Sequence, residues 1–157
     1  LQGLTPPAGS KSVEELKQIV SWAQRPFILK GIMTARGAEK ALEAGASGIV
    51  VSNHGGRVLD HCPATAEVLP EIVDAVGGKM TIFVDGAIRS GMDMFKALAL
   101  GADAVLIGRP FVTTVYGGGE EGVQLYVQKL KAELADTMRM CGAHSLAEIK
   151  RSMLFGF

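Results

Sequence analysis

The sequence has 157 residues, and its 16 lysines and arginines balance 16 aspartates and glutamates, so the formal net charge is zero. This neutrality removes the electrostatic attraction expected of a protein that binds nucleic acid or an anionic membrane. Apolar residues make up 48% of the chain and the two cysteines fit neither a metal motif nor a disulfide framework. We therefore expect a cytosolic protein with a single core, in which residues 1–11 form a loop and residues 12–157 form repeated βα units.

Short apolar runs alternate with amphipathic helical patterns along the chain. Ser12–Glu15 is typical of a capping box and predicts a first helix after it. The apolar runs, which predict buried parallel strands, are 27–29, 49–51, 81–84 and 104–107. The helical patterns that follow them are 35–44, 66–76, 91–100 and 122–140, with a flexible glycine segment at 117–119 and a short capped helix at 145–148.

Glycine is over-represented, with 20 of 157 residues where roughly 7% is usual. Gly45 and Gly101 each follow a helical pattern, at the position where a left-handed residue ends a helix. The turns 45–48 and 101–104 are also near-copies of one another, and each leads into an apolar run. Such repeated βα units predict an α/β barrel or a doubly wound sheet. The barrel is favoured because no G-x-G-x-x-G motif follows the first predicted strand.

Polar or glycine-rich residues follow all four predicted strands. They are Lys30, the segment 52–57, the segment 85–91 and the segment 108–110. Each has an ordinary explanation when taken alone, such as a solvated lysine, a buried histidine or a local pair between Arg57 and Asp60. The carboxyl ends of the strands form the active-site rim of a βα barrel, so their coincidence predicts a functional site.

The third and fourth of these segments suit a phosphate. Gly86 and Gly108 allow backbone amides to approach an anion, while Arg89 and Arg109 add guanidinium groups. We expect Ser90 to cap the next helix and its N-terminus to join this cradle. Barrels often place a phosphate site after strands seven and eight, so the four strands are interpreted as strands 5–8 of a TIM (β/α)8 barrel, its C-terminal half.

The first two segments suit acid–base chemistry. His54 has an imidazole suited to accepting a proton near neutral pH. Arg57 can bind a carboxylate through two parallel hydrogen bonds. Lys30 supplies positive charge where negative charge develops.

At these residues the chain resembles the FMN-dependent α-hydroxy-acid oxidase and dehydrogenase family, which includes glycolate oxidase and lactate oxidase. The segments that carry the resemblance are 29–32, 52–57, 85–91 and 108–110, in the family's order and spacing. The string Ser52-Asn53-His54-Gly55-Gly56-Arg57 is highly specific for it. One departure is Ala87, where the family commonly has glycine, and we expect the alanine to be a small change at negative φ.

The resemblance implies FMN as the cofactor and oxidation of an L-2-hydroxy acid to the 2-oxo acid as the reaction. It implies that His54 is the base, that Arg57 binds the substrate carboxylate and that Lys30 and Ser52 contact the flavin. It assigns the ribityl-phosphate site to Asp85, Gly86, Ala87, Ile88, Arg89, Gly108 and Arg109. The charge balance and the lack of a metal-ligand set predict no nucleic acid, membrane or metal, and the resemblance implies a homo-oligomer, a tetramer in the family.

The length accounts for only half of the roughly 250 residues of a barrel, so we expect the missing N-terminal half, or another copy, as a partner. Two alternatives to the oxidoreductase stay open at this point. One is another phosphate-binding barrel, similar to type 2 isopentenyl diphosphate isomerase or IMP dehydrogenase. The other is a half-barrel fragment without catalytic activity.

Overall fold

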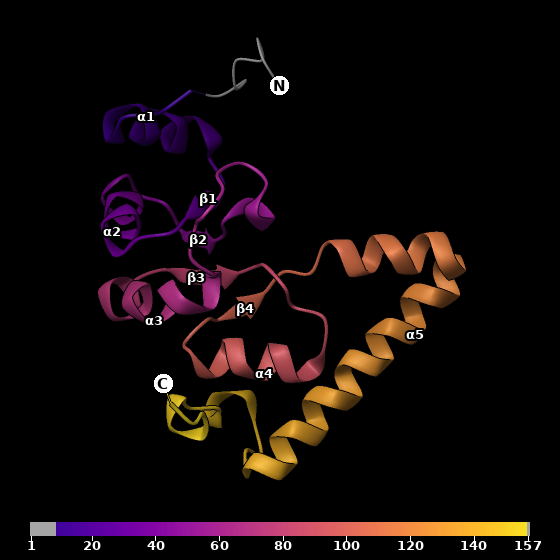
Figure 1. Cartoon of the computed structure of the whole chain (residues 1–157). Coiled ribbons are helices and arrows are strands. Elements are labelled where there is room, and N and C mark those ends of the chain that lie inside the picture. The colour runs from indigo at the N-terminus through magenta and orange to yellow at the C-terminus, as the bar shows by residue number, and fades with distance from the viewer. Residues whose placement is uncertain (1–8, 157) are drawn as a thin grey trace.

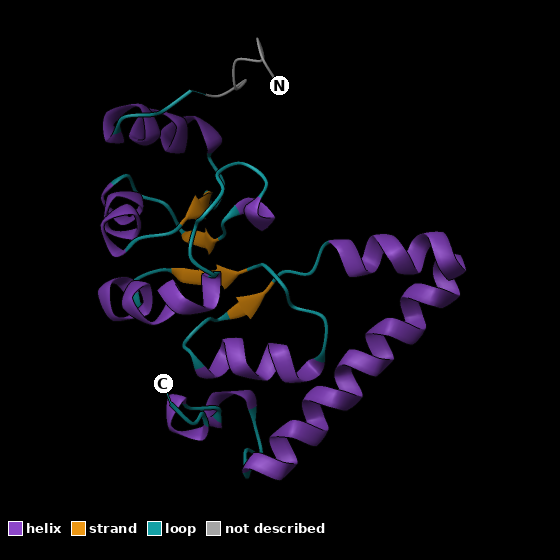
Figure 2. Cartoon of the chain, in the orientation of Figure 1, coloured by secondary structure: helices purple, strands orange, loops and turns teal. Residues whose placement is uncertain are grey.

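The computed structural model describes residues 9–156, as a parallel sheet with helices packed around it (Figures 1 and 2). The strands are β1 (Ile28–Ile32), β2 (Gly48–Val51), β3 (Thr81–Val84) and β4 (Ala104–Val105). The helices are α1 (Val13–Ala23), α2 (Ala35–Glu43), α3 (Thr65–Val76), α4 (Gly91–Ala99) and α5 (Arg109–Cys141), with 3-10 turns η1 (His54–Gly56), η2 (Leu146–Glu148) and η3 (Arg151–Met153). Most of the loop expected over residues 1–11 lies outside the described residues. Within them, no helix is both long and apolar enough to cross a membrane.

The four strands lie side by side in chain order, β1-β2-β3-β4, and every pairing is parallel. Figure 1 shows α2 and α3 beside the strands, and α5 on the side toward which β3 and β4 point, running back to pack against α4. All of β2 is buried, which explains its unbroken Gly-Ile-Val-Val sequence. The architecture is therefore the expected mixed α/β type with a parallel sheet.

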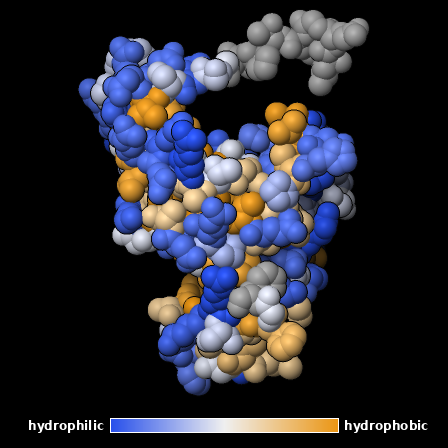
Figure 3. All heavy atoms as spheres, turned by 60° about the vertical axis from the view of Figure 1, so that its left-hand side comes forward, coloured by the Kyte–Doolittle hydropathy of each residue, from blue (hydrophilic) through white to orange (hydrophobic). Residues whose placement is uncertain are grey.

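One hydrophobic core joins the sheet to the helices that cover it. Its fully buried members include Ile49, Val51, Leu69, Ile72, Val76 and Ile82. Small residues on α2, Ala38 and Ala41, allow that helix to approach the sheet closely. Figure 3 turns the left-hand side of Figure 1 toward the viewer. The surface seen there is largely hydrophilic, with smaller hydrophobic areas between the polar side chains.

The repeated turns have the same structure. The amide of Ala46 donates to the carbonyl of Ala41, and the amide of Ala102 donates to that of Ala97, at 3.0 and 3.2 Å. Gly45 and Gly101 have φ of 86° and 104°, so both take the left-handed conformation that ends a helix. The internal repeat predicted from the sequence is confirmed at the level of hydrogen bonds.

Several predicted boundaries were wrong. β1 continues to Ile32 instead of ending at residue 29, and β4 contains only Ala104 and Val105.

The capping box at Ser12 is confirmed, because Ser12 Oγ accepts from the Glu15 amide at 3.2 Å. The segment 145–148 forms a 3-10 turn, and Ser145 gives it no side-chain cap.

The largest difference concerns the last helix. α5 consists of two helical segments joined at Gly119: the second corresponds to the helix predicted from about residue 122, and the first, which begins at Arg109, was not predicted. The helix changes direction at Gly119, where φ is 54° and ψ is −137°. Helical propensity alone does not predict this segment, since three consecutive glycines disfavour a helix.

Candidate active site

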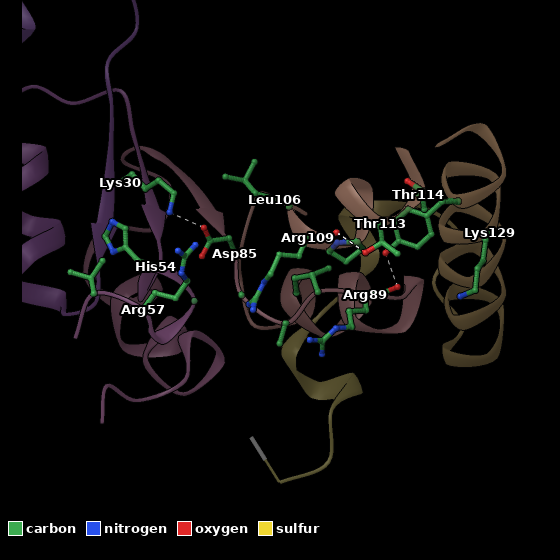
Figure 4. Close-up of a pocket in the computed structure, with 18 residues that line it drawn as sticks. Lys30, His54, Arg57, Asp85, Arg89, Leu106, Arg109, Thr113, Thr114 and Lys129 are labelled. Atoms are coloured by element: carbon green, nitrogen blue, oxygen red, sulfur yellow. Dashed lines mark hydrogen bonds and ion pairs between the residues drawn. The ribbon is translucent and has the colours of Figure 1, made fainter. Parts of the chain in front are cut away.

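A cavity of about 1000 Å³ opens at the carboxyl ends of the strands. Ten of the eleven predicted site residues line it: Lys30, His54, Arg57, Asp85, Gly86, Ala87, Ile88, Arg89, Gly108 and Arg109. Figure 4 shows Lys30, His54, Arg57 and Asp85 at one end of the cavity, called here the histidine end, and Arg89 toward the other. Segments distant in the sequence therefore meet at one edge of the sheet, as the barrel interpretation predicted.

Lys30 reaches the cavity from within β1, not from beyond the end of a strand. Alternation along β1 turns Leu29 toward the core and Lys30 toward the cavity. Lys30 Nζ donates to Ser52 Oγ at 2.7 Å and forms an ion pair with Asp85 Oδ2 at 2.9 Å. Ser52 is fully buried and lines no part of the cavity itself, so its hydroxyl acts here through Lys30.

Asp85 keeps an unused hydrogen-bond acceptor. Its Oδ1 atom is buried and has no partner among residues 9–156, although Oδ2 pairs with Lys30. Thr65 Oγ1 donates to the backbone carbonyl of Asp85 at 2.7 Å, which fixes the turn that begins there. A buried acceptor without a donor is costly, so this carboxylate suits a ligand or partner with a hydroxyl or amide group.

His54 begins the 3-10 turn η1 directly after β2. Its φ is 57°, an unusual conformation for a residue with a side chain. The His54 amide donates to Ser52 Oγ at 3.1 Å, and Asn53 Oδ1 accepts from the Gly55 amide at 3.0 Å. These local bonds hold the turn so that the imidazole faces the cavity.

Arg57 is exposed at the same end of the cavity. The local ion pair between Arg57 and Asp60, which was the ordinary explanation for this arginine, does not form. Asp60 Oδ2 instead lies 3.8 Å from His61 Nε2. Arg57 has no ion pair within the described part of the chain. Its guanidinium is therefore available to an anionic ligand.

The far end of the cavity presents backbone amides. Five of them make no hydrogen bond to any described residue: Gly86, Ala87, Ile88, Gly108 and Arg109. The left-handed φ values of Gly86 and Ala87, 97° and 59°, form the turn that carries the first three. Together with the side chain of Arg89, and with Arg109, whose guanidinium reaches back to within 3.3 Å of a Cβ built on Gly55, these five amides make an anion site that we call the cradle.

The N-terminus of α4 does not join the cradle, which corrects the sequence-based expectation. Ser90 caps α4 as predicted, but Asp93 Oδ2 accepts from the amides of Arg89 and Ser90, each at 3.0 Å. The Gly91 amide donates to Glu133 Oε2 of α5 at 2.9 Å. Carboxylates of the protein already occupy this helix end.

Those hydrogen bonds determine the charge of the two carboxylates. Burial raises the pKa of Asp93, but the bonds from the Arg89 amide and from Ser90 outweigh it and lower the pKa below its ordinary value. The bonds from Lys129 and from the Gly91 amide lower the pKa of Glu133 in the same direction. Both groups are therefore anionic at neutral pH.

Ala87 also differs from expectation. The alanine was expected to be a small change on the condition that its φ is negative, and the observed value is 59°. An alanine in the left-handed region costs roughly 1–2 kcal/mol relative to an unstrained residue. The departure from the family's glycine is therefore a strained one, although Ala87 still lines the cavity.

Sequence reasoning missed the wall that α5 contributes. Tyr126 Oη donates to the carbonyl of Arg89 at 2.9 Å, and its ring packs edge-to-face on Phe111 with centroids 5.1 Å apart. Burial raises the pKa of Tyr126. The other lining residues from this wall are Pro110, Thr113, Thr114 and Lys129. Tyr126 lies four residues before the buried Leu130, on the same face of the helix, a spacing that could have identified it.

The charge of the lining is strongly unbalanced. Five cationic residues line the cavity (Lys30, Arg57, Arg89, Arg109 and Lys129), against the single acid Asp85. A chain of zero net charge thus concentrates positive charge at one site. An anionic ligand, or two anionic ligands side by side, would match this lining.

Comparison with known proteins gives a consistent result. The family described as FMN-dependent dehydrogenase matches residues 6–155. A peroxisomal (S)-2-hydroxy-acid oxidase from Oryza sativa subsp. japonica is 48% identical over 149 residues, which are 95% of this chain and 40% of the relative. L-lactate oxidase from Roseobacter sp. (strain GAI101) is 43% identical over 146 residues, 93% of this chain and 40% of the relative.

A crystal structure of mandelate oxidase superposes with a TM-score of 0.86 at 43% identity, covering 90% of this chain and 41% of that protein. The chain thus spans about two fifths of the length of the relatives it matches.

Proposed function

Because this chain belongs to the FMN-dependent dehydrogenase family, we propose that it carries the acid–base and phosphate-binding part of an enzyme that oxidises L-2-hydroxy acids to 2-oxo acids. The observation that carries this proposal is the single cavity. It is lined both by His54 and Arg57 and by the residues that carry the cradle amides. Relatives named as glycolate, lactate and mandelate oxidases support a substrate of the lactate or glycolate type.

The residues present fit FMN. Five free amides and two arginines suit the phosphate, and the unpaired Asp85 Oδ1 suits a ribityl hydroxyl. Lys30 and Ser52 would hold the flavin ring, and Asp85, Gly86, Ala87, Ile88, Arg89, Gly108 and Arg109 would hold the ribityl-phosphate chain. FMN, when bound, supplies the acceptor for the two electrons that leave the substrate.

The protein's own residues then divide the chemistry. Arg57 binds the substrate carboxylate and directs the substrate carbon toward His54. His54 removes one proton, either from Cα or from the hydroxyl as the Cα hydrogen leaves with its electron pair; both routes release two electrons and two protons and leave a 2-oxo acid. Lys30, held by Asp85 and Ser52, supplies fixed positive charge beside the reacting groups. Oxygen or another acceptor completes the cycle.

We further propose that the described sheet is strands 5–8 of a (β/α)8 barrel. Its parallel order and the coverage of about two fifths of mandelate oxidase support this interpretation. β1 and β4 are sheet edges, and each carries a partly exposed apolar residue beside it, Ile28 and Leu106. Complementary βα units, or a second copy of the chain, would cover these edges. The expected cytosolic location stays a prediction.

An anaerobic substrate screen tests the function. The protein that contains this sequence, loaded with FMN, should lose its flavin absorbance on addition of L-lactate or glycolate and regain it when oxygen is readmitted. Absence of bleaching with every 2-hydroxy acid tested would refute the proposal. Tight FMN binding without bleaching would favour a half-barrel that binds phosphate without turnover.

A further inference from the structure

Gly31 lies where β1 departs from regular pairing. Lys30 pairs with Val50 and Ile32 pairs with Val51, so Gly31 is the extra residue of a β-bulge. Its φ is 95°, in the left-handed region that a residue with a side chain enters only under strain. The bulge directly follows Lys30, at the histidine end of the cavity.

The imidazole of His54 fills the space beside Gly31. A Cβ atom built on Gly31 would lie 2.7 Å from His54 Cε1, 3.4 Å from Nε2 and 3.7 Å from Nδ1. Carbon atoms in contact ordinarily stay about 3.5–4.0 Å apart. The ring therefore presents its Cε1 edge to the bare α-carbon of Gly31, and any side chain there would displace it.

Hydrogen bonds of the described residues do not fix the orientation of this ring. The His54 backbone is held by its amide bond to Ser52 Oγ, but within residues 9–156 neither imidazole nitrogen has a hydrogen-bond partner. Ser52 Oγ also accepts from Lys30 Nζ, so Lys30 and the His54 backbone share one buried anchor. The close approach to Gly31 is therefore the contact of the ring that a single added methyl group would abolish.

We propose that Gly31 is a positioning residue for His54: the absence of a side chain at the β1 bulge sets how closely the imidazole approaches the strand that carries Lys30. The inference rests on the proposed role of His54 as the base. A side chain at position 31 leaves the imidazole chemically intact and moves its nitrogens away from the substrate proton.

Gly31→Ala tests this in the FMN-loaded protein that contains the sequence. We expect kcat for the 2-hydroxy acid to fall about 100-fold, the usual consequence of misplacing a reacting group by about 1 Å. KM should change little, because Arg57 is untouched. Gly78→Ala is the matched control, since Gly78 has φ of 73° and no atom within 4 Å of its added Cβ. It carries similar backbone strain and should keep the original kcat. Unchanged kcat in Gly31→Ala would overturn the proposal.

A second measurement needs neither FMN nor turnover. Proton NMR of the wild-type protein should show a strong NOE between Gly31 Hα and His54 Hε1. The added methyl group of Gly31→Ala collides with the His54 imidazole, so it should lower the free energy of unfolding less in a His54→Ala background than in the wild type. The positioning role would be refuted if Gly31→Ala lowered the free energy of unfolding equally in both backgrounds, or if the NOE were missing. If the two substitutions affect stability non-additively but the protein oxidises no hydroxy acid, the proposed function is refuted while the contact between Gly31 and His54 remains supported.

Discussion

The two ends of the cavity are built from different parts of the chain. At the histidine end the groups facing the cavity are side chains, His54, Arg57 and Lys30, held through a buried hydroxyl and a bulged strand. The cradle instead consists mainly of backbone amides, which are held by the left-handed turn at Gly86 and Ala87 and by the bonds of Thr65 and Asp93 beside it. Substitutions at the first end should therefore change the rate of reaction, and substitutions at the second should change FMN affinity or stability.

The largest effect is expected from His54→Ala. Loss of a general base lowers kcat by about 10²–10⁴-fold, while FMN affinity should be retained because the cradle is unaffected. Steady-state kinetics and flavin fluorescence titration measure the two quantities separately. His61→Ala is the control, since His61 has the same φ of 57° in an exposed loop. A parallel loss of FMN affinity in His54→Ala would show that the two ends are not independent.

Arg89→Met should have the converse effect. A hydrogen bond to a charged group contributes about 1.5–3 kcal/mol, so FMN should bind roughly 10- to 100-fold more weakly. At saturating FMN, kcat should be unchanged. Arg36→Met on α2 removes an exposed arginine that does not line the cavity and should leave both quantities as they were. Equal losses in the two variants would argue against the cradle.

Asp93→Asn examines how the cradle is supported. The lowered pKa of Asp93 means that its ionised form stabilises the fold: this stability is complete above the ordinary carboxyl pKa and is lost as pH falls through the lower value. The variant should be less stable by about 0.5–1 kcal/mol at neutral pH, and the difference should vanish in acid.

Chemical denaturation at neutral and acidic pH measures this difference. Asp74→Asn on α3 serves as the control because it removes an exposed carboxylate that caps no helix. A difference for Asp93→Asn that stayed constant into acid would contradict the role of its charge.

Ala87→Gly should have the smallest effect. Glycine relieves the strain at φ of 59° but loses more entropy on folding, so the free energy of unfolding should rise by at most about 1 kcal/mol. Ala132→Gly, in the regular part of α5, should change it in the opposite direction. Destabilisation by Ala87→Gly would mean that the methyl group contributes packing at the cradle end.

Much of the site was predictable because its residues follow buried strands. The order of strands and the repeat at Gly45 and Gly101 predict which segments share an edge, and ten of eleven predicted residues do line one cavity. The exception, Ser52, shows the limit of this reasoning. Its position at a strand end does not reveal that the side chain turns inward to bond Lys30 and the His54 amide.

The contacts of α5 could not be predicted in the same way. Its first turns contain glycines that disfavour a helix, and its long-range partners, Arg89 and Gly91, lie about one βα unit earlier in the chain. Local propensity contains no information about such pairs. The occupation of the α4 N-terminus by Glu133 likewise depends on where the bend at Gly119 directs the rest of the helix.

The sequence by itself thus determined the parallel α/β class, the chemistry-bearing segments and the family, because strand burial, residue type and spacing are local properties. Only the tertiary structure decided which amides remain free, which carboxylates close the α4 N-terminus, and that His54 packs on Gly31. Each of these depends on close contacts between segments distant in the chain, where a difference of about 1 Å decides whether atoms bond or collide.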